Sequence, residues 1–229
     1  MIDIHSHVLP FVDDGSDSYE CSFNMLNESV KQGITDIILT PHYKRAYAKT
    51  PETIREAFEK FCALKNEQNI PVNLYLGQEI FAHSNTCEML EKKRALTLNG
   101  TSYVLVEYRV SEFCDIVESV YELKKAGYLP IIAHAERYPY FTPLEAQEVK
   151  ELGGKIQANA SSIAGKEKRA CKVRAHALIK FGLVDFVASD SHIHRDNAMK
   201  KAHKWVERKF GAETAEKIFI TNAKEIIEG

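Results

Sequence analysis

Short apolar stretches recur along the chain and are separated by longer amphipathic ones. Seven of the short stretches have the length of a strand, and they cover residues 1–5, 34–40, 72–77, 102–106, 129–133, 155–158 and 184–188. They lack the polar–apolar alternation of a sheet with one face in water. We therefore expect strands that are buried on both faces, as in a parallel sheet.

The amphipathic stretches predict helices, several of which have clear start signals. Ser16 is the expected cap of the first helix, and Thr50 precedes Pro51, the preferred residue for a first helical position. Thr142 and Glu145 form a capping box. The predicted helices cover residues 16–32, 50–69, 85–93, 112–126, 142–153 and 168–181, with further helices from about residue 195.

Seven strands that alternate with helices predict parallel strands joined by right-handed crossovers. A closed or nearly closed barrel that forms one domain over residues 1–229 fits this pattern best. An open doubly wound sheet is the alternative. Neither a G-x-G-x-x-G nor a G-x-x-x-x-G-K-[ST] motif is present, so dinucleotide-binding and P-loop functions lose their main support.

Composition narrows the function further. The 30 basic and 32 acidic residues give a net charge of −2, so the whole chain has no electrostatic attraction for nucleic acid or an anionic membrane. No apolar run approaches the roughly 20 residues that span a bilayer, and the first residues do not resemble a signal peptide. Five scattered cysteines without a C-x-x-C motif are typical of a reducing compartment. We expect a cytoplasmic protein.

Histidines and carboxylates follow the predicted strands at their carboxyl ends. Those ends meet on one face of a parallel α/β fold, where active sites form. The candidate residues are His5, His7, Asp14, His42, Glu79, Glu107, His134, Asp190 and His192. Asn159 also ends a strand.

Each motif has an ordinary structural explanation when it is taken alone. His5-x-His7 is compatible with a simple polar pair, His42 with a turn, and Asp190 with a helix cap. Together, nine imidazole and carboxylate groups at one end of a sheet indicate metal binding. This donor set suits zinc, iron or manganese. Nine donors exceed the needs of one ion, so we expect two or three divalent ions, with manganese favoured and iron or zinc as alternatives.

Five motifs resemble those of the polymerase-and-histidinol-phosphatase (PHP) superfamily, and more narrowly its CpsB/YwqE-type protein-tyrosine phosphatases. The most specific is His-Ser-His-Val-Leu-Pro-Phe-Val-Asp-Asp-Gly-Ser at positions 5–16. The others are Thr-Pro-His (40–42), Gly-Gln-Glu (77–79), Ile-Ala-His-Ala-Glu-Arg (132–137) and Ala-Ser-Asp-Ser-His (188–192). The resemblance extends from residue 1 to about residue 195. It implies a distorted (β/α)7 barrel.

The resemblance also implies roles for individual residues. One ion would be bound by His5, His7, Glu79 and Asp190, a second by Glu79, Glu107 and His134, and a third by Asp14, His42 and His192. Arg137 and Arg195 match the arginines that contact phosphate. The implied activity is metal-dependent hydrolysis of phosphotyrosine, a phosphoric monoester, on the tail of a bacterial tyrosine kinase that regulates capsular or exopolysaccharide synthesis.

Two positions depart from the family pattern. Phe11 stands where Gly is usual, and Arg109 stands where an apolar residue or Pro is usual. Neither change removes a ligand, and Arg109 adds a cation near the predicted mouth of the site. Arg45 lies in a basic loop that also contains Lys44 and Lys49, and we expect Arg45 to help bind an acidic, tyrosine-rich peptide.

Other functions stay open at this point. A small-molecule phosphatase such as histidinol-phosphate phosphatase would use the same scaffold, and a nuclease or a binding module without turnover are further alternatives. A cysteine-nucleophile phosphatase is disfavoured because no cysteine has an arginine six residues later. His194 is a candidate general acid, with an exposed structural role as the alternative. The oligomeric state is not predicted.

Overall fold

The computed structural model describes residues 1–47, 49–195 and 197–229, with the side chain of Arg45 outside the described part. Within these ranges the strands are β1 (Ile2–Ser6), β2 (Asp36–Leu39), β3 (His42–Tyr43), β4 (Asn73–Leu76), β5 (Glu79–Phe81), β6 (Tyr103–Glu107), β7 (Leu129–Ile132), β8 (Lys155–Asn159) and β9 (Phe186–Ala188). All of the strand pairs are parallel. The predicted parallel sheet is therefore confirmed.

Two of the predicted strands are each broken into two segments. β2 and β3 flank Thr40 and Pro41, and β4 and β5 flank Gly77 and Gln78. Pro41 has no N–H to donate to the ladder, and a Cβ at Gly77 would lie 2.6 Å from Leu98 Cδ2. The breaks divide the sheet into one part with the order β1-β2-β4 and another with the order β3-β5-β6-β7-β8-β9.

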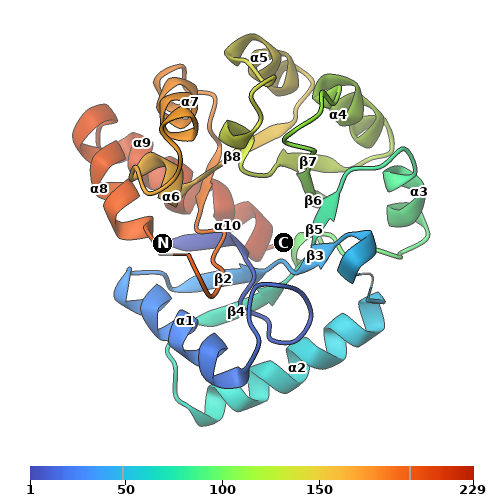
Figure 1. The fold of residues 1–229 in the computed structure, drawn as a ribbon, viewed down its shortest axis with the longest axis vertical. Helices are drawn as coiled ribbons and strands as arrows, with labels where there is room; N and C mark the ends of the chain where they lie inside the picture. Colours follow the sequence, from blue (N-terminus) through green and yellow to red (C-terminus); the bar gives the residue numbers. More distant parts are fainter. Residues whose placement is uncertain (48, 196) are drawn as a thin grey trace.

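The two ends of the sheet curl toward each other. The amide of Asp190 donates to the carbonyl of His5 at 2.9 Å, and the amide of His7 donates to the carbonyl of Ser191 at 3.0 Å. These bonds place the chain after β9 beside the end of β1. Figure 1 shows the strands around the middle of the molecule and most helices outside them. The curled parallel sheet has the form of a half-barrel. It confirms the predicted distorted (β/α)7 barrel.

Helices fill the crossovers and the end of the chain. They are α1 (Tyr19–Lys31), α2 (Pro51–Glu67), α3 (Thr86–Glu91), α4 (Ile116–Lys125), α5 (Pro143–Glu151), α6 (Ala160–Ile163), α7 (Arg169–Lys180), α8 (Met199–Phe210), α9 (Ala212–Glu216) and α10 (Asn222–Ile227). The Thr50 cap and the Thr142–Glu145 capping box are confirmed. No helix among the described residues has the length and hydropathy needed to cross a bilayer.

Two helix starts differ from the prediction. The cap of α1 is Ser18, which accepts from the amide of Cys21, whereas Ser16 pairs with the hydroxyl of Ser22 at 2.8 Å. α4 begins at Ile116, several residues later than predicted, because the Asp115 side chain caps it. Turn residues that hydrogen-bond locally compete with helix starts, so both predictions were wrong in position.

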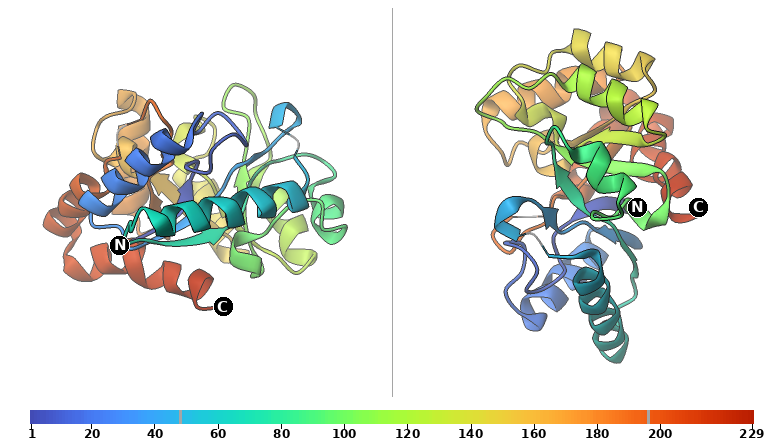
Figure 2. Two further views of the ribbon diagram at one scale, coloured as in Figure 1. Left: turned by 90° about the horizontal axis from the view of Figure 1, so that it is seen from below. Right: turned by 90° about the vertical axis from the view of Figure 1, so that its right-hand side faces the viewer.

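The inside of the barrel changes from apolar to polar along the strands. Its amino end holds an apolar cluster that includes Leu105 of β6 and Ala188 of β9, and α10 closes this end through Ile226. Two residues beyond Leu105, on the same side of β6, stands Glu107, and Asp190 follows the end of β9. Figure 2 shows the C-terminal helices and the N-terminus on the same side of the molecule. The polar residues therefore gather at the opposite, carboxyl end.

Candidate metal centre

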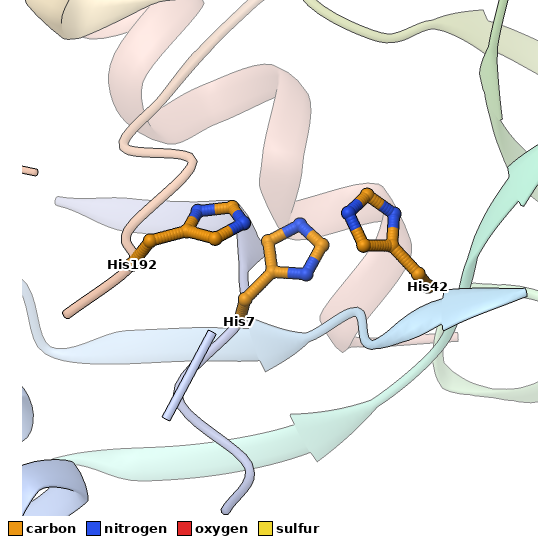
Figure 3. Close-up of side chains that lie close together, drawn as sticks. All are labelled: His7, His42 and His192. Atoms are coloured by element: carbon orange, nitrogen blue, oxygen red, sulfur yellow. The ribbon is translucent and has the colours of Figure 1, made fainter. Parts of the chain in front are cut away.

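The nine predicted donor side chains come together at the carboxyl end of the barrel. Figure 3 shows three of them, His7, His42 and His192, which come from separate segments and have their rings close together. The ring centroids of His7 lie 4.4 Å from those of His42 and 4.2 Å from those of His192. The expected meeting of these side chains is therefore seen in the structure, while their role as ligands stays a prediction.

Glu79, the first residue of β5, lies in the middle of the cluster. Its Oε1 is 3.3 Å from His5 Nε2 and 2.9 Å from His134 Nε2. Its Oε2 is 3.4 Å from His7 Nε2 and 2.7 Å from His42 Nδ1. A carboxylate with two imidazoles at each oxygen has the arrangement needed to bridge two ions.

Asp190 presents its two oxygens to different partners. Oδ1 is 3.6 Å from the Nε2 atoms of both His5 and His7. Oδ2 is 3.1 Å from Arg137 Nη1 and also pairs with Arg195 Nη1. The backbone of Asp190 has φ 51° and that of His134 has φ 32°, a left-handed region that is costly for residues other than glycine and is often found at functional sites.

The remaining donors lie nearer the solvent. Asp14 is 52% exposed, with its Oδ1 3.5 Å from His42 Nε2 and 4.0 Å from His192 Nε2. Glu107 is 18% exposed, with its Oε2 3.7 Å from His42 Nδ1 and its Oε1 3.8 Å from His134 Nε2. These residues form the outer edge of the cluster.

Donor atoms group in three sets that overlap. Within the described residues, atoms within 4.8 Å of one another belong to the sets His5–His7–Asp190, His42–Glu79–Glu107 and His7–His42–His192. The first is part of the predicted first ion site, and the third shares His42 and His192 with the predicted third. The second contains His42 in place of His134. His42 therefore lies between two of the predicted ion sites.

Four of the five histidines are held by an oxygen at Nδ1, which leaves Nε2 directed to the cluster. The pairs are His5 with Gln157 Oε1 (3.2 Å), His7 with Asp13 Oδ2 (2.7 Å), His134 with Tyr138 Oη (3.2 Å) and His192 with the Asp190 carbonyl (3.0 Å). Such contacts set the ring orientation and tautomer of histidines that bind metal. This donor chemistry fits divalent ions.

Unpaired polar atoms give an independent test of that fit. Among the described residues, the buried atom Glu107 Oε2 has no hydrogen-bond partner, and the buried atoms His42 Nδ1 and Glu79 Oε2 lie 2.7 Å apart without the alignment of a hydrogen bond. Leaving a buried polar atom unpaired is costly. All three atoms belong to one of the donor sets above, so a cation placed among them would satisfy three groups that the protein leaves unpaired.

Burial and charge set the protonation of the cluster. Burial opposes ionisation of Glu79, but His5 and the other imidazoles hold its pKa well below the usual range. Burial and the nearby charge of His7 lower the pKa of His192 to about 3. Burial disfavours the charged form of His7, yet Asp13 raises its pKa well above the usual value. Glu79 is thus ionised and His192 is neutral, the forms that bind a metal, whereas His7 must lose a proton to do so.

The candidate arginines have different surroundings. Arg137 is 18% exposed, and its Nη2 lies 3.3 Å from Glu167 Oε1 in addition to its contact with Asp190. Arg195 is 35% exposed. Arg109 instead pairs with Glu112 at 2.8 Å, and its side chain is half-exposed. The side chain of Arg45, the fourth candidate, lies outside the described residues.

Three residues that hold the histidines were not identified as site residues from the sequence. Asp13 was seen only as the neighbour of Asp14, although its carboxylate also accepts from the amides of Gly15 and His42. Tyr138 gave no sequence signal. Gln157 did give one, since a glutamine in the middle of an otherwise buried strand is unusual.

Phe11, the first departure from the family pattern, has φ 66°. Glycine adopts this backbone region without strain, which explains a preference for glycine at this position. Phe11 is 54% exposed, and its ring lies edge-on to Tyr19 with centroids 5.2 Å apart. His194, the candidate acid, is exposed.

A cavity of about 730 Å³ opens beside the donors. It lies between α1 and the segment after β9, and His192 and Arg195 form part of its wall. Acidic side chains of α1, including Glu20 and Glu28, face it from the other side. The cavity therefore adjoins the outer edge of the donor cluster at His192.

Comparison with known sequences places the chain in a family. The family described as "Capsular polysaccharide synthesis, CpsB/CapC" matches residues 1–228. The chain belongs to the CpsB/CapC family. This confirms the resemblance that the motifs at the strand ends indicated.

Curated relatives in this family are named tyrosine-protein phosphatases. The chain is 34% identical to tyrosine-protein phosphatase YwqE of Bacillus subtilis, with 93% of this chain and 86% of the relative covered. It is 35% identical to tyrosine-protein phosphatase CpsB of Streptococcus agalactiae, with 100% and 98% covered. The similarity therefore covers the barrel and the C-terminal helices alike.

Solved structures agree with the fold. A crystal structure from work on YwqE of B. subtilis and CpsB of Streptococcus pneumoniae, described as unique metal-dependent tyrosine phosphatases, has a TM-score of 0.87 and 33% identity, with 94% of this chain and 90% of that chain covered. Histidinol phosphate phosphatase of Lactococcus lactis, solved with zinc, L-histidinol and phosphate, has a TM-score of 0.62 and 11% identity, with 91% and 93% covered. The second comparison supports the fold alone.

Proposed function

We propose that this protein is a metal-dependent protein-tyrosine phosphatase. The proposed substrate is the phosphotyrosine-containing tail of a bacterial tyrosine kinase that acts in capsular or exopolysaccharide synthesis. The observation that carries the proposal is that Arg137 and Arg195 both pair with Asp190 of the donor cluster. The relatives that this chain matches over 86% and 98% of their length are named tyrosine-protein phosphatases.

For the ions we propose the ligand sets that the motif resemblance implies. The first ion would be bound by His5, His7, Glu79 and Asp190, the second by Glu79, Glu107 and His134, and the third by Asp14, His42 and His192. Three divalent ions exceed the charge of the four carboxylates by about +2, which favours a phosphate dianion. Manganese, iron and zinc all accept these donors. Bound ions of this kind polarise phosphoryl oxygens and lower the pKa of water.

The arginines supply the charge that the protein itself directs at the phosphate. Arg137 and Arg195 both pair with Asp190 Oδ2. A phosphate that enters the cluster offers several oxygens to the same guanidinium groups, and arginine binds phosphate with paired hydrogen bonds. In the reaction these two residues hold the phosphoryl oxygens and stabilise the charge that develops on them.

The leaving group makes modest demands on the protein. A tyrosine phenolate has a conjugate acid with a pKa of about 10, so it needs less help from a general acid than an alkoxide does. The cavity beside His192 and Arg195 provides room for the residues that flank the phosphotyrosine. Arg109 and the loop around Arg45 are further candidates to contact such a peptide.

Phosphate release by protein purified without chelator tests the proposal. Bound metal is measured by mass spectrometry, and a phosphotyrosine peptide, a phosphoserine peptide and histidinol phosphate are compared as substrates. We expect the highest kcat/KM for the phosphotyrosine peptide, loss of activity after metal removal, and recovery with Mn²⁺, Fe²⁺ or Zn²⁺. A clear preference for histidinol phosphate, or full activity after metal removal, would overturn the proposal.

A further inference from the structure

Two amide side chains of β8, Gln157 and Asn159, lie directly beneath the donor cluster. Both are fully buried. They are two residues apart and therefore face the same side of the strand, whereas Ile156 and Ala158 pack in the outer apolar core. Buried amides are kept only where their hydrogen bonds are made, so their partners show what they do.

Gln157 contacts two segments that carry donors. Its Oε1 is 3.2 Å from His5 Nδ1 and accepts from the backbone amide of His134 at 2.7 Å. Its Nε2 donates to Asn159 Oδ1 at 2.8 Å. One amide therefore holds β1, β7 and β8 in a fixed relation at the level of the donors.

Asn159 continues the chain of hydrogen bonds to Asp190. Its Nδ2 donates to Asp190 Oδ2 at 2.8 Å. Its backbone amide donates to the carboxylate of Glu136, at 3.2 and 3.3 Å from the two oxygens, and the Ser162 hydroxyl donates to the same carboxylate at 2.7 Å. Asn159 is thus fixed both through its backbone amide, by Glu136, and through its side chain, by Asp190.

We infer that Gln157 and Asn159 are positioning residues of the metal centre, which hold His5, His134 and Asp190 in the orientation that binds the first and second ions. The inference rests on the proposed function, because it concerns the ions of that site. Gln157 Oε1 keeps a proton on His5 Nδ1, so the Nε2 lone pair is free for an ion. Asn159 holds Asp190 Oδ2, so Oδ1 is directed to the same ion.

The neutral amides suit this place better than charged groups. The other histidine of the first ion, His7, is held by the carboxylate of Asp13, and a second carboxylate under His5 would reduce the positive charge available for phosphate. Asn159 also differs from Arg137 and Arg195, which share Asp190 Oδ2 with it. A phosphate competes for both arginines, whereas Asn159 is buried and keeps its bond to Asp190.

Titration of metal-free protein with Co²⁺ alone tests the inference. Calorimetry gives the affinity, and the visible absorption of Co²⁺ reports its coordination. Gln157→Leu removes every hydrogen bond of that amide, and Asn159→Ala removes the bond to Asp190. Asn222→Ala is the matched control, since the Asn222 amide donates to the carbonyl of Asp185 at 2.8 Å at the closed end of the barrel.

We expect both site variants to bind Co²⁺ about 10- to 100-fold more weakly than wild type, with altered absorption, and the control to match wild type. Gln157→Glu keeps an oxygen toward His5 and is expected to recover affinity relative to Gln157→Leu. A merely structural role predicts no such recovery, because Glu buries a charge. Gln157→Glu can also be tested if Gln157→Leu does not fold.

Equal Co²⁺ affinity and absorption in wild type, Gln157→Leu and Asn159→Ala would overturn the inference. Weakened binding in Gln157→Leu with no recovery in Gln157→Glu would also count against it. Failure of the proposed function has a different signature, since wild-type protein would then bind no Co²⁺ or would bind it without phosphatase activity.

Discussion

The donor cluster contains two regions that are built differently. The inner donors, His5, His7, Glu79, His134 and Asp190, have side chains that are at most 3% exposed. The outer donors, Asp14, His42, Glu107 and His192, are 7% to 52% exposed. Buried donors cannot exchange partners with water, so the protein must hold them in place.

Hydrogen bonds from neighbouring residues hold most of the inner donors in place, and fewer such bonds hold the outer donors. Gln157, Asp13 and Tyr138 each support one inner histidine, and Asn159 supports Asp190. Asp14, in contrast, lies in a loop and is half-exposed. Ions bound by the inner donors should therefore bind tightly and be essential for activity. An ion at the outer edge should bind more weakly and exchange more readily.

The largest effect is expected from Glu79→Gln. The change keeps the size of the side chain but removes the charge that faces four imidazoles. We expect kcat to fall by about 10³-fold or more and the bound metal to fall to one ion or fewer per chain. Phosphate release and mass spectrometry measure both quantities. Retention of normal metal content and turnover would contradict a central role for this carboxylate.

Asp14→Asn is expected to have a smaller effect, because Asp14 belongs to the outer donors. Loss of one ion per chain should accompany a fall in kcat/KM of about 10- to 100-fold, with the inner ions retained. The same assays apply, and Glu213→Gln on the exposed surface of α9 serves as a control. A loss of all bound metal in Asp14→Asn would show that the two regions do not behave separately.

Arg137→Ala should separate phosphate binding from metal binding. We expect kcat/KM for a phosphotyrosine peptide to fall about 10- to 100-fold, while metal content stays at the wild-type level. Arg55→Ala is a suitable control, because Arg55 pairs with Glu52 on the exposed surface of α2. If Arg137→Ala released metal, the assigned role of Arg137 in binding phosphate would be wrong.

The inner and outer donors were equally visible in the sequence, because both follow the carboxyl ends of strands. Glu107 and Asp190 stand two residues beyond Leu105 and Ala188, which face the barrel interior. Once the strands are predicted to be parallel, their carboxyl ends meet at one end of the barrel, and the period of two turns a strand residue such as Glu107 toward its interior. That is why the fold, and the meeting of the nine candidate donors at one end of it, could be predicted from the sequence.

The supporting contacts could not be predicted, because they depend on local backbone geometry. β1 has one more residue than β2 between Asp3 and Ser6, a bulge that turns His5 to the same interior as Ile4. The left-handed backbone of His134 and Asp190 likewise leaves no trace in a hydrophobic pattern. The partners of Gln157 follow from these irregularities, so only the structure identifies them.

A moderate effect on stability is expected from the pair of His7 and Asp13. Burial opposes ionisation of Asp13, but His7 and backbone amides lower its pKa to about 2 from an ordinary value near 3.8. A lowered pKa stabilises the fold above pH 4, and this stabilisation is lost as the pH falls toward 2. For the metal-free protein it amounts to roughly 2 kcal/mol.

Urea unfolding of EDTA-treated protein checks this expectation. Asp13→Asn should be less stable than wild type by roughly 2 kcal/mol near pH 5, and the difference should shrink as the pH falls from 4 to 2. The difference should also shrink at high pH, because the raised pKa of His7 marks where its charge is lost. If the difference in unfolding free energy between wild type and Asp13→Asn does not vary with pH, the loss of stability comes from packing and not from charge.

The smallest effect is expected from the cysteines, which belong to neither donor region. Among the described residues Cys21, Cys62, Cys87, Cys114 and Cys171 are all free thiols, and none contributes to a donor set. Single Cys→Ser variants should therefore keep kcat/KM for a phosphotyrosine peptide within about twofold, since changes away from a site have small effects. Loss of activity in one folded variant, with its metal retained, would point to a thiol nucleophile and against the role of the inner donors.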